Sequence, residues 1–307
     1  MNLSELLKDV TVESLTGNPQ LAINGIAFDS RAVKPGNLFV CISGFETDGH
    51  KYAPQAIEKG AAAILAERDL SDLGVTCAVV KNSRKALALV SAAFYGHPEK
   101  NFCLIGVTGT NGKTTTTYLI KSVLEAMGKK VGLIGTNQNM IGTEIIPSKR
   151  TTPDSLELMR LFSKMAEKKV DYAIMEVSSH SLVLDRVTAC TFDVGAFTNI
   201  TQDHLDFHKT MEEYLKAKGI LFQISKNGAI NADDPAAKQL LELSTCEKML
   251  TYGVENECDM RASNVELREN GVFFVLNYEG KEYHVELGIP GKFSVYNALT
   301  ALSALAV

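Results

Sequence analysis

A glycine-rich segment between an apolar run and a helical one constrains this chain more than any other feature. The apolar run 102–108 reads FCLIGVT, and Gly109–Thr115 reads GTNGKTT. Glycines in such a turn let backbone N–H groups face a bound phosphate, and the N-terminus of the next helix adds partial positive charge. In this setting Lys113 reaches the β- and γ-phosphates, and the Thr114 hydroxyl ligates Mg²⁺. The segment therefore predicts an α/β protein with a loop that binds ATP with magnesium.

The spacing of this loop departs from the usual G-x-x-x-x-G-K-[ST] pattern. Gly106 lies one residue too far from Gly112, and Gly109 lies too near. The alternative is a glycine-rich strand-to-helix turn with an incidental lysine. An expected strand before the loop, an expected helix after it and GKT in the turn favour the phosphate loop.

Alternating strands and helices predict two α/β domains. We place the first at residues 1–97 and the second at 98–307, joined at the helix-breaking segment 96–101, GHPEKN. In the first domain, strands are expected at 36–43, 62–66 and 76–80, and helices at 52–59 and 83–95. In the second, strands are expected at 102–108, 130–134, 172–177, 194–199 and 228–231, and helices at 114–127, 153–168 and 211–224. Such alternation predicts a doubly wound, mostly parallel sheet with ligands at the carboxyl ends of its strands.

The end of the chain carries a different pattern. Period-two alternation over 251–286, around a turn at Tyr278–Gly280, predicts a β-hairpin. A helix is expected from about Ser294 to Val307, with no capping residue after it. We therefore expect that the chain has been cut within a longer architecture.

Composition limits the partners and the compartment. The formal charge is −5 with acidic and basic residues interleaved, which disfavours nucleic acid because phosphate-binding surfaces carry a basic excess. Six cysteines without a C-x-x-C pair indicate reduced thiols. The N-terminus, MNLSELLKDV, does not resemble a signal peptide, and the apolar runs are too short for a membrane span. A soluble, cytoplasmic protein is expected.

Acidic and histidine side chains follow two apolar strands of the second domain. Glu176 ends the run YAIMEV, where a carboxylate can bind magnesium or can simply be exposed at the strand end. Ser178–His180 come next and suit either ligand contacts or a helix cap. The segment 198–208, TNITQDHLDFH, can ligate a metal or position water, or can be a polar loop with solvated histidines. Its spacing does not match a zinc site. Lys218, on the helix that follows, is expected to be solvated on physical grounds alone.

Taken together, these segments resemble the Mur ligase family, and within it the UDP-N-acetylmuramoyl-tripeptide synthetase (MurE) type. The first domain carries DSRAVKPGNLFV (29–40) and GFETDGHKY (44–52), which resemble the UDP-binding half of the family. The second carries GVTGTNGKTTT (106–116), RTTPDS (150–155), MEVSSHSLVLDRV (175–187), TNITQDHLDFH, YLKAKGILF (214–222), NADD (231–234) and GKFSVYNALTAL (291–302). The segments RTTPDS (150–155) and SSHSLVLDR (178–186) favour the MurE type over relatives that add alanine, glutamate or the terminal dipeptide.

The resemblance implies a reaction and an organisation. ATP phosphorylates the free side-chain carboxylate of D-Glu in UDP-N-acetylmuramoyl-L-Ala-D-Glu, giving an acyl phosphate. The amino group of a diamino acid, L-lysine or meso-diaminopimelate, then attacks, and phosphate leaves. The resemblance implies a small N-terminal UDP-binding domain followed by a central ATPase domain. A monomer is expected.

The resemblance also implies roles for individual residues. Lys113, Thr114 and Glu176 would serve the triphosphate and a first magnesium. His204 would help hold a second magnesium, and Lys218 would be carbamoylated into an anionic ligand of the metal site. Further nucleotide contacts would come from Gly109, Thr110, Asn111, Gly112 and Thr115 of the loop, and from Asn297 near the adenine. The UDP moiety would contact Ser30, Arg31 and His50, and the muramoyl dipeptide would contact Thr151, Thr152, Ser178 and Arg186.

Two departures from the family pattern limit these implications. Leu184 stands where some relatives have a glutamine that touches substrate. The family also has a third, C-terminal domain that binds the amino acid, and this chain ends where that domain would begin. We therefore expect a truncated form that binds both nucleotides and ligates poorly. Two other interpretations are a related ligase such as a folylpolyglutamate synthetase, against which the first-domain segments speak, and a nucleotide-binding module without ligase activity.

Overall fold

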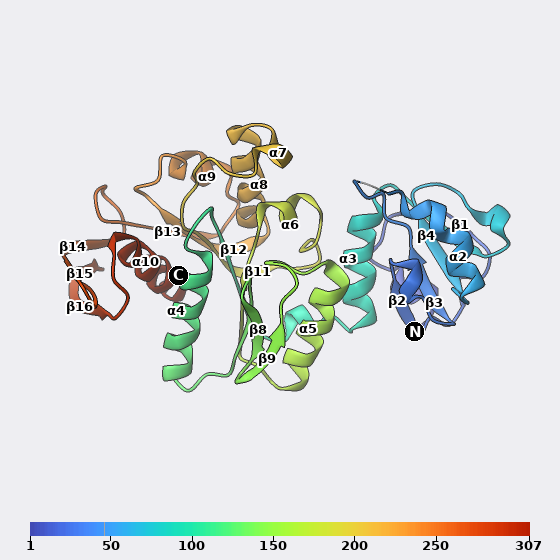
Figure 1. Cartoon of the computed structure of the whole chain (residues 1–307), viewed down its shortest axis with the longest axis horizontal. Helices are drawn as coiled ribbons and strands as arrows, with labels where there is room; N and C mark the ends of the chain where they lie inside the picture. Colours follow the sequence, from blue (N-terminus) through green and yellow to red (C-terminus); the bar gives the residue numbers. More distant parts are fainter. Residues whose placement is uncertain (46) are drawn as a thin grey trace. The chain divides into compact units, whose positions relative to one another are not determined.

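Two units make up the chain in the structure, a computed structural model that describes residues 1–45 and 47–307 (Figure 1). Glu46, within the segment 44–52, lies outside the described residues. Unit 1 comprises Met1–Pro98, Asp154–Ser163 and Leu184–Ala189. Unit 2 comprises Glu99–Pro153, Lys164–Val183 and Cys190–Val307. We describe each unit by itself.

A five-stranded sheet forms the centre of unit 1. Its strands lie in the order β1 (Val12–Thr16), β5 (Thr76–Val80), β4 (Ala63–Ala66), β3 (Asn37–Val40) and β2 (Gly25–Ala27). Pairing is parallel from β2 to β5, and only β1 joins the described sheet antiparallel. The expected strands β3, β4 and β5 are confirmed. The sequence did not indicate β1 and β2, because β1 is mostly exposed and β2 has only three residues.

The side chains of β3 alternate between the two faces of this sheet, and they contribute to an apolar layer on each face. Leu38 and Val40 pack on one face with side chains of α1 (Leu3–Leu6) and α3 (Ser83–Phe94). Phe39 lies on the other face with side chains of α2 (Ala53–Glu58). Because successive residues of a strand face opposite sides, a strand covered on both faces is apolar throughout. Short 3₁₀ helices complete this part of the chain at η1 (Ser30–Ala32), η2 (Gly49–Tyr52), η3 (Ser71–Leu73) and η4 (Pro98–Lys100).

An eleven-stranded sheet spans unit 2. Its parallel part runs β14 (Met260–Arg268), β13 (Lys248–Gly253), β12 (Ser225–Asn231), β11 (Phe192–Phe197), β6 (Cys103–Thr108), β10 (Tyr172–Glu176) and β7 (Val131–Ile134). Antiparallel strands extend both edges: β15 (Gly271–Tyr278) and β16 (Lys281–Leu287) beyond β14, and β8 (Gln138–Ile141) and β9 (Glu144–Pro147) beyond β7. The prediction of a mostly parallel sheet is confirmed.

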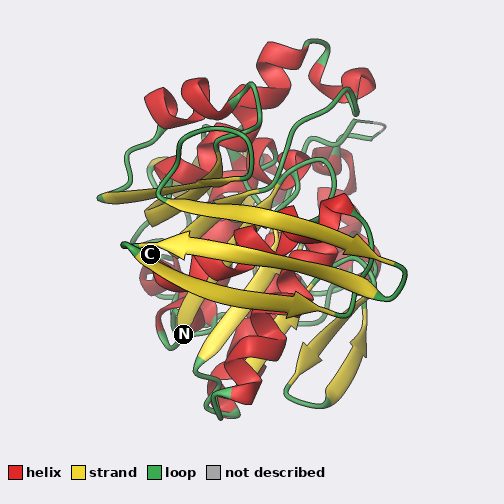
Figure 2. Cartoon of the chain, turned by 90° about the vertical axis from the view of Figure 1, so that its left-hand side faces the viewer, coloured by secondary structure: helices red, strands yellow, loops and turns green. Residues whose placement is uncertain are grey.

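Turn chemistry explains the hairpin at the β16 edge. Glu279 and Gly280 both have positive φ, 50° and 73°, and they connect β15 to β16 at the predicted turn. Two consecutive residues with positive φ give the twist that a tight hairpin needs. Figure 2 views the chain from this side and shows β14, β15 and β16 lying side by side. The β8–β9 hairpin was not predicted, because its strands have four residues each and little apolar alternation.

Four helices lie close to the expected positions: α4 (Lys113–Ala126), α5 (Ser155–Glu167), α8 (Met211–Gln223) and α10 (Lys292–Ala306). Three shorter helices were not predicted: α6 (Ser179–Val183), α7 (Leu205–His208) and α9 (Ala237–Leu243). The apolar face of α10 packs on β13, β14 and β15 through Val295, Ala298 and Leu299. In the described part of the chain, no helix has both the length and the apolar character needed to cross a membrane.

A buried tyrosine joins the sheet of unit 2 to α10. The Tyr252 hydroxyl donates to the Phe197 carbonyl at 2.7 Å and lies 2.5 Å from Thr300 Oγ1. We expect Tyr252→Phe to lower the free energy of unfolding by about 1–3 kcal/mol, because a buried hydrogen bond is lost with its partners left in place. Urea unfolding followed by circular dichroism measures this.

The matched control is Tyr283→Phe on β16, where the side chain is exposed. It should change the free energy of unfolding by less than about 0.5 kcal/mol. If both substitutions changed the free energy of unfolding by the same small amount, the Tyr252 hydroxyl would not stabilise the fold as we expect.

Candidate active site

The glycine-rich loop connects β6 to α4, as the sequence predicts, and its shape is fixed by the residues after β11. Thr110 N–H donates to the Asn199 carbonyl at 2.8 Å, and Asn111 N–H donates to Asn199 Oδ1 at 3.0 Å. The Thr198 hydroxyl donates to the Asn111 carbonyl at 2.6 Å. Two segments that are far apart in the sequence therefore form one rigid loop pair at the carboxyl edge of the sheet.

Two glycines of this loop have no room for a side chain. A Cβ on Gly109 would lie 1.9 Å from Thr198 Oγ1, and Gly112, the N-cap of α4, has a φ of 89°. A Cβ on Gly112 would lie 2.3 Å from Asn297 Oδ1, so the Asn297 side chain on α10 lies directly against the loop. Gly106 instead lies inside β6. The unusual glycine spacing thus reflects one glycine that belongs to the strand.

Lys113 is folded over the loop. Its Nζ donates to the carbonyls of Gly109 at 2.9 Å and Thr110 at 2.8 Å. Burial lowers the pKa of Lys113, and the nearby Glu176 and Asp203 carboxylates oppose that shift. The Lys113 ammonium therefore lies against two carbonyls of the loop, at the N-terminus of α4.

Glu176 is buried at the carboxyl end of β10, and its carboxylate accepts three hydrogen bonds. The Thr114 hydroxyl and the Thr136 N–H each donate to Oε1 at 2.9 Å, and the Thr136 hydroxyl donates to Oε2 at 2.9 Å. The alternative of an exposed carboxylate at the strand end is wrong, because both neighbouring strands cover it. Sequence reasoning missed Thr136, although it is a small polar residue directly after a strand, the same signal that marked Ser178.

The oxygen atoms of Thr114 and Glu176 fit magnesium. Mg²⁺ takes oxygen ligands and is commonly held by one or two carboxylates together with substrate phosphates. These two side chains lie 2.9 Å apart beside the phosphate loop. Within residues 1–45 and 47–307, no group of three or more His, Cys, Asp and Glu side chains could hold a metal by itself.

Three histidine rings gather after β10 and β11. The centroid of the His180 ring lies 4.9 Å from that of His204 and 5.4 Å from that of His208. His208 is buried, and its Nε2 lies 2.8 Å from Ser179 Oγ. His204 is half exposed at the N-cap of α7, with a φ of 52°. The alternative of two solvated histidines is therefore wrong for His208, which is buried, whereas His204 and most of residues 201–206 are exposed.

Lys218 is 1% exposed, so the expectation of a solvated lysine is wrong. The physical reason is that α8 packs this side against the sheet and the histidine loop. Its Nζ lies 4.3 Å from the centroid of the Tyr214 ring, and the Tyr214 hydroxyl lies 3.2 Å from Thr110 Oγ1 of the loop. Burial first, and then the charge of Lys113, lowers the pKa of Lys218 well below its ordinary value. Among the described residues, no hydrogen bond or ion pair reaches its ammonium group.

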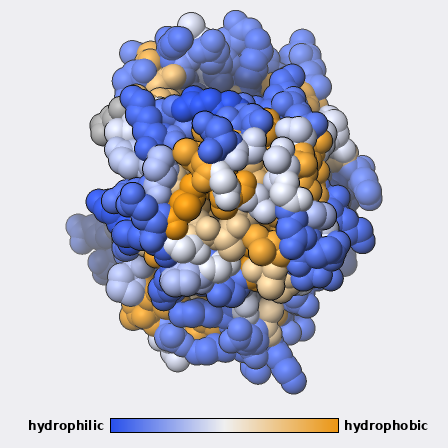
Figure 3. All heavy atoms as spheres, turned by 90° about the vertical axis from the view of Figure 1, so that its right-hand side faces the viewer, coloured by the Kyte–Doolittle hydropathy of each residue, from blue (hydrophilic) through white to orange (hydrophobic). Residues whose placement is uncertain are grey.

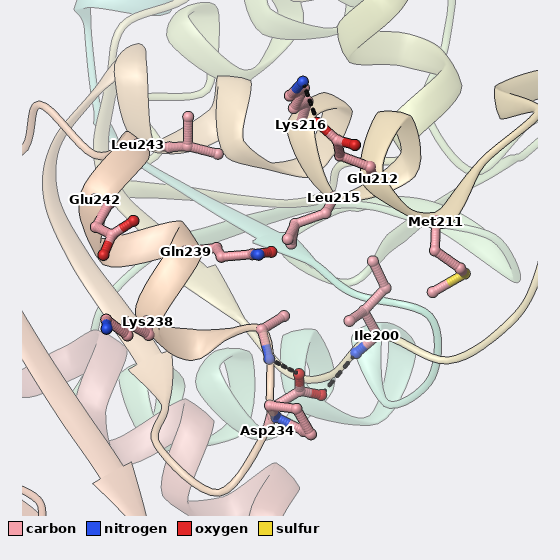
Figure 4. A pocket seen from close by; sticks show the side chains of 12 residues that line it. Ile200, Met211, Glu212, Leu215, Lys216, Asp234, Lys238, Gln239, Glu242 and Leu243 are labelled. Carbon is pink, nitrogen blue, oxygen red and sulfur yellow. Dashed lines mark hydrogen bonds and ion pairs between the residues drawn. The ribbon is translucent and has the colours of Figure 1, made fainter.

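Asp234, from the NADD segment, holds the loop after β11 in place. Its carboxylate accepts from Ile200 N–H at 2.8 Å and from Ala236 N–H at 2.9 Å, as Figure 4 shows. It also borders a cavity of about 770 Å³ between α8 and α9, whose floor includes Met211 and Leu215. Among the described residues that line this cavity, none is a predicted site residue.

The TTP segment, residues 151–153, holds the end of β10 in place through hydrogen bonds. The Thr152 hydroxyl is buried, donates to the Glu176 carbonyl at 2.9 Å and accepts from Ser178 N–H at 3.0 Å. Thr151 Oγ1 lies 3.0 Å from Thr136 Oγ1. Thr151 and Ser178 are partly exposed and can meet a ligand, whereas Thr152 acts on the backbone.

Unit 1 has its own cavity, of about 560 Å³, beside η1 and η2. Its lining combines the apolar Phe28, Phe39, Ile42 and Tyr52 with the polar Asp29, Ser30, Arg31 and Gln55. The Ser30 hydroxyl donates to Gln55 Oε1 at 2.6 Å, and the exposed Arg31 pairs with Asp29 at 2.8 Å. Ser30 and Arg31 therefore line one hollow, and their contact with UDP stays a prediction. Figure 3 views the chain from the end that Figure 1 draws at the right, and shows apolar surface bordered by hydrophilic side chains.

His50 is placed differently from Ser30 and Arg31. It is 3% exposed, its Nδ1 lies 2.6 Å from Asp48 Oδ1, and its Nε2 accepts from Glu67 N–H at 2.9 Å. Both ring nitrogens are thus used inside the unit, while the neighbouring Gly49 lines the cavity. Direct contact of His50 with UDP stays a prediction.

Arg186 and Leu184 lie in the segment Leu184–Ala189, which belongs to unit 1, whereas Ser178 belongs to unit 2. Both side chains of the segment are partly buried. The predicted contacts of Arg186 and Ser178 with the muramoyl dipeptide stay predictions.

A parallel sheet with a glycine-rich loop between its central strand and a helix, and a carboxylate ending the next strand, defines a phosphate-loop α/β protein. The chain belongs to the Mur ligase family. The model of the Mur ligase middle domain matches residues 107–305, and that of the Mur ligase family catalytic domain matches residues 22–99.

Similar proteins agree with this assignment. A UDP-N-acetylmuramoyl-L-alanyl-D-glutamate–2,6-diaminopimelate ligase of Clostridium botulinum is 49% identical over 99% of this chain and 63% of its own length. A ligase of the same name from Bacillus licheniformis is 44% identical over the whole chain and 64% of its own length. The solved structure of a ligase of this name has a TM-score of 0.86 at 28% identity, covering 98% of this chain and 62% of that one. The chain thus spans about 63% of the length of the relatives it matches.

Folylpolyglutamate synthetase, the related ligase considered above, shares the fold. A solved structure of the enzyme from Lactobacillus casei has a TM-score of 0.55 at 20% identity, over 71% of this chain. This is a likeness of fold alone.

The pKa of His208 gives the site a pH-dependent stability. Burial first, and then the neighbouring charges of His180 and Lys218, lowers the pKa of His208 to about 4 from 6.5. The unfolded state therefore binds the extra proton between these values, so stability falls as pH drops from about 6.5 toward 4. The loss is expected to reach at most about 3 kcal/mol.

His208→Gln keeps a donor toward Ser179 and removes the titration. We expect its free energy of unfolding to decline less between pH 7 and pH 5 than that of the unchanged chain, as measured by urea unfolding at both values. Parallel declines in the two proteins would show that His208 is not the titrating group.

Proposed function

We propose that this chain takes part in the ATP-dependent ligation of a diamino acid to UDP-N-acetylmuramoyl-L-Ala-D-Glu, a step of peptidoglycan-precursor synthesis. The observation that carries the proposal is the site formed by Lys113, Thr114 and Glu176, with 2.9 Å between the last two, in a chain of this family. The names of the similar ligases favour diaminopimelate over lysine. We further propose a cytoplasmic monomer with a UDP-binding domain at 1–97 and an ATP-binding domain at 98–307.

The loop and Lys113 would hold the triphosphate. The N–H groups of Thr110 and Asn111 donate to Asn199, so the remaining N–H groups of the loop and the N-terminus of α4 would face the phosphates. Lys113 would exchange its two loop carbonyls for phosphate oxygens. Asn297, which lies against Gly112, would contact the base. Thr114 and Glu176 would hold a first magnesium, and His204 with a modified Lys218 a second. Bound there, magnesium would offset the negative charge that develops on the phosphoryl group.

The chemistry needs two displacements. A side-chain carboxylate oxygen of D-Glu attacks the γ-phosphorus, the bond to the β-phosphate oxygen breaks, and ADP leaves. The amine of the diamino acid then attacks the acyl carbon, phosphate leaves with the bonding pair, and the amine loses a proton. Ser30 and Arg31 would contact UDP. His50 would either contact UDP or hold the loop of unit 1 beside it. Thr151, Thr152, Ser178 and Arg186 would hold or orient the dipeptide.

Lys218 has the features of a lysine that reacts with carbon dioxide. Because its pKa is lowered, a neutral amine is available to attack the carbon of CO₂. A C–N bond forms, one C=O electron pair moves to oxygen, and the nitrogen loses a proton. The product is an anion, which the nearby charge of Lys113 favours.

Two binding measurements test the proposed function. We expect calorimetry to show that the chain binds ATP with magnesium, and that it separately binds UDP-N-acetylmuramoyl-L-Ala-D-Glu. Lys113→Ala should weaken nucleotide binding by about tenfold or more, because a charge-assisted contact to phosphate is lost, and leave the dipeptide affinity unchanged.

The controls are Lys129→Ala, on the exposed turn after α4, and UDP-N-acetylmuramoyl-L-Ala, which lacks the reacting glutamate. Lys129→Ala should bind ATP like the unchanged chain. UDP-N-acetylmuramoyl-L-Ala should bind to the unchanged chain more weakly than the dipeptide form does. ATP binding without any preference for the dipeptide form would refute the substrate and leave only a nucleotide-binding module.

A carbamate on Lys218 is directly observable. With isotopically labelled bicarbonate, NMR should show a carbamate carbonyl signal that Lys218→Arg abolishes, because a guanidinium does not attack CO₂. Lys216→Arg, on the exposed side of the same helix, is the matched control and should keep the signal. A signal that survives Lys218→Arg would place the modification elsewhere.

A further inference from the structure

Thr136 contacts the Glu176 carboxylate with both of its donors. Its N–H reaches Oε1 and its hydroxyl reaches Oε2, each at 2.9 Å. A carboxylate held at both oxygens cannot rotate about its terminal bond without losing a bond. Thr114 supplies the third hydrogen bond from the opposite side. Thr136 therefore contributes two of the three bonds that set the direction of the remaining carboxylate lone pairs.

Sheet order explains why Thr136 is in reach. β10 lies between β6 and β7, and Met175 pairs with Ile134 in the parallel register. Chains leaving β6 and β7 therefore pass on either side of Glu176. Gly135 makes this approach possible, since a Cβ there would lie 2.4 Å from Glu176 Oε1.

The segment that carries Thr136 is itself anchored. Gly135 N–H donates to Oδ1 of the buried Asn139 at 3.3 Å. On the other side, the Thr151 hydroxyl lies 3.0 Å from that of Thr136. The Thr136 hydroxyl therefore has two acceptors in reach, Glu176 Oε2 at 2.9 Å and Thr151 Oγ1 at 3.0 Å, and the charged carboxylate is the stronger of them. Thr136 is thus held in one orientation by the TTP segment.

We propose that Thr136 is a positioning residue that aims the Glu176 carboxylate at the magnesium of the nucleotide. The inference rests on the proposed function, because it takes Glu176 as a magnesium ligand. Hydrogen bonds to a ligating carboxylate fix its orientation, and their loss typically weakens metal affinity by about 10- to 100-fold.

The test uses the magnesium dependence of ATP binding, measured by calorimetry with magnesium and with a chelator. Thr136→Val keeps the size and the N–H bond, and removes the hydroxyl with its bond to Oε2 and its contact with Thr151. We expect it to reduce the gain in ATP affinity that magnesium provides by about tenfold, and to leave affinity in the chelator unchanged. Thr136→Ser restores the hydroxyl and should behave like the unchanged chain.

Thr143→Val, at the exposed turn of the β8–β9 hairpin, is the matched control and should have no effect. Equal losses with and without magnesium would show damage to the loop, and an unchanged magnesium gain would show that the hydroxyl does not aim the carboxylate. Either result overturns the inference. If the unchanged chain gains nothing from magnesium, the metal assignment of the proposed function fails first, and the role of Thr136 with it.

Discussion

The hydrogen bonds between the phosphate loop and the residues after β11 are the constraint on which the site depends. They bring Thr110 and Asn111 against Asn199 and leave no space for a side chain at Gly109. Because β6 and β11 are parallel neighbours, both segments leave the sheet at the same edge. This edge also carries Glu176, from β10 on the other side of β6. A sheet order that placed another strand between them would separate the cation of the loop from the carboxylate.

Buried charge is the second organising factor. Lys113, Lys218 and Glu176 are all at least partly buried within one part of unit 2. Burial lowers the pKa of both lysines, and Lys113 further lowers that of Lys218. Asp203 opposes both shifts, and Asp234 opposes that of Lys218. Such an arrangement gains little stability by itself, because desolvation of the two cations offsets their attraction to the acids. It becomes favourable when anionic phosphates enter, which is why perturbed lysines of this kind gather at binding sites.

Local sequence patterns predicted the strands and the helix at this edge of the sheet. They failed for features that depend on tertiary packing. The strands β6 and β10 and the helix α4 follow from continuous apolar runs, a glycine turn and helical spacing, all of which are local. The burial of Lys218 depends on what α8 packs against, so an exposed lysine was the wrong expectation. Thr136 was missed for a related reason: its partner Glu176 is distant in the sequence, and only the strand order shows that the two meet. The short hairpin β8–β9 carries too few alternating residues to be recognised.

The buried ring of His50 acts on the backbone of unit 1. Its ring joins Asp48 to the backbone of Glu67, and Glu67 in turn accepts from Ser83 N–H and the Ser83 hydroxyl at the start of α3. Asp48 itself caps the backbone of the segment that lines the unit 1 cavity, and these bonds hold its pKa near 2. The ring therefore fixes the loop whose Gly49 faces the cavity. Thr152 acts in the same way beside Glu176, since its hydroxyl bonds to backbone on both sides of the strand end. In both units, part of the family pattern holds backbone in place so that neighbouring residues can bind the ligand.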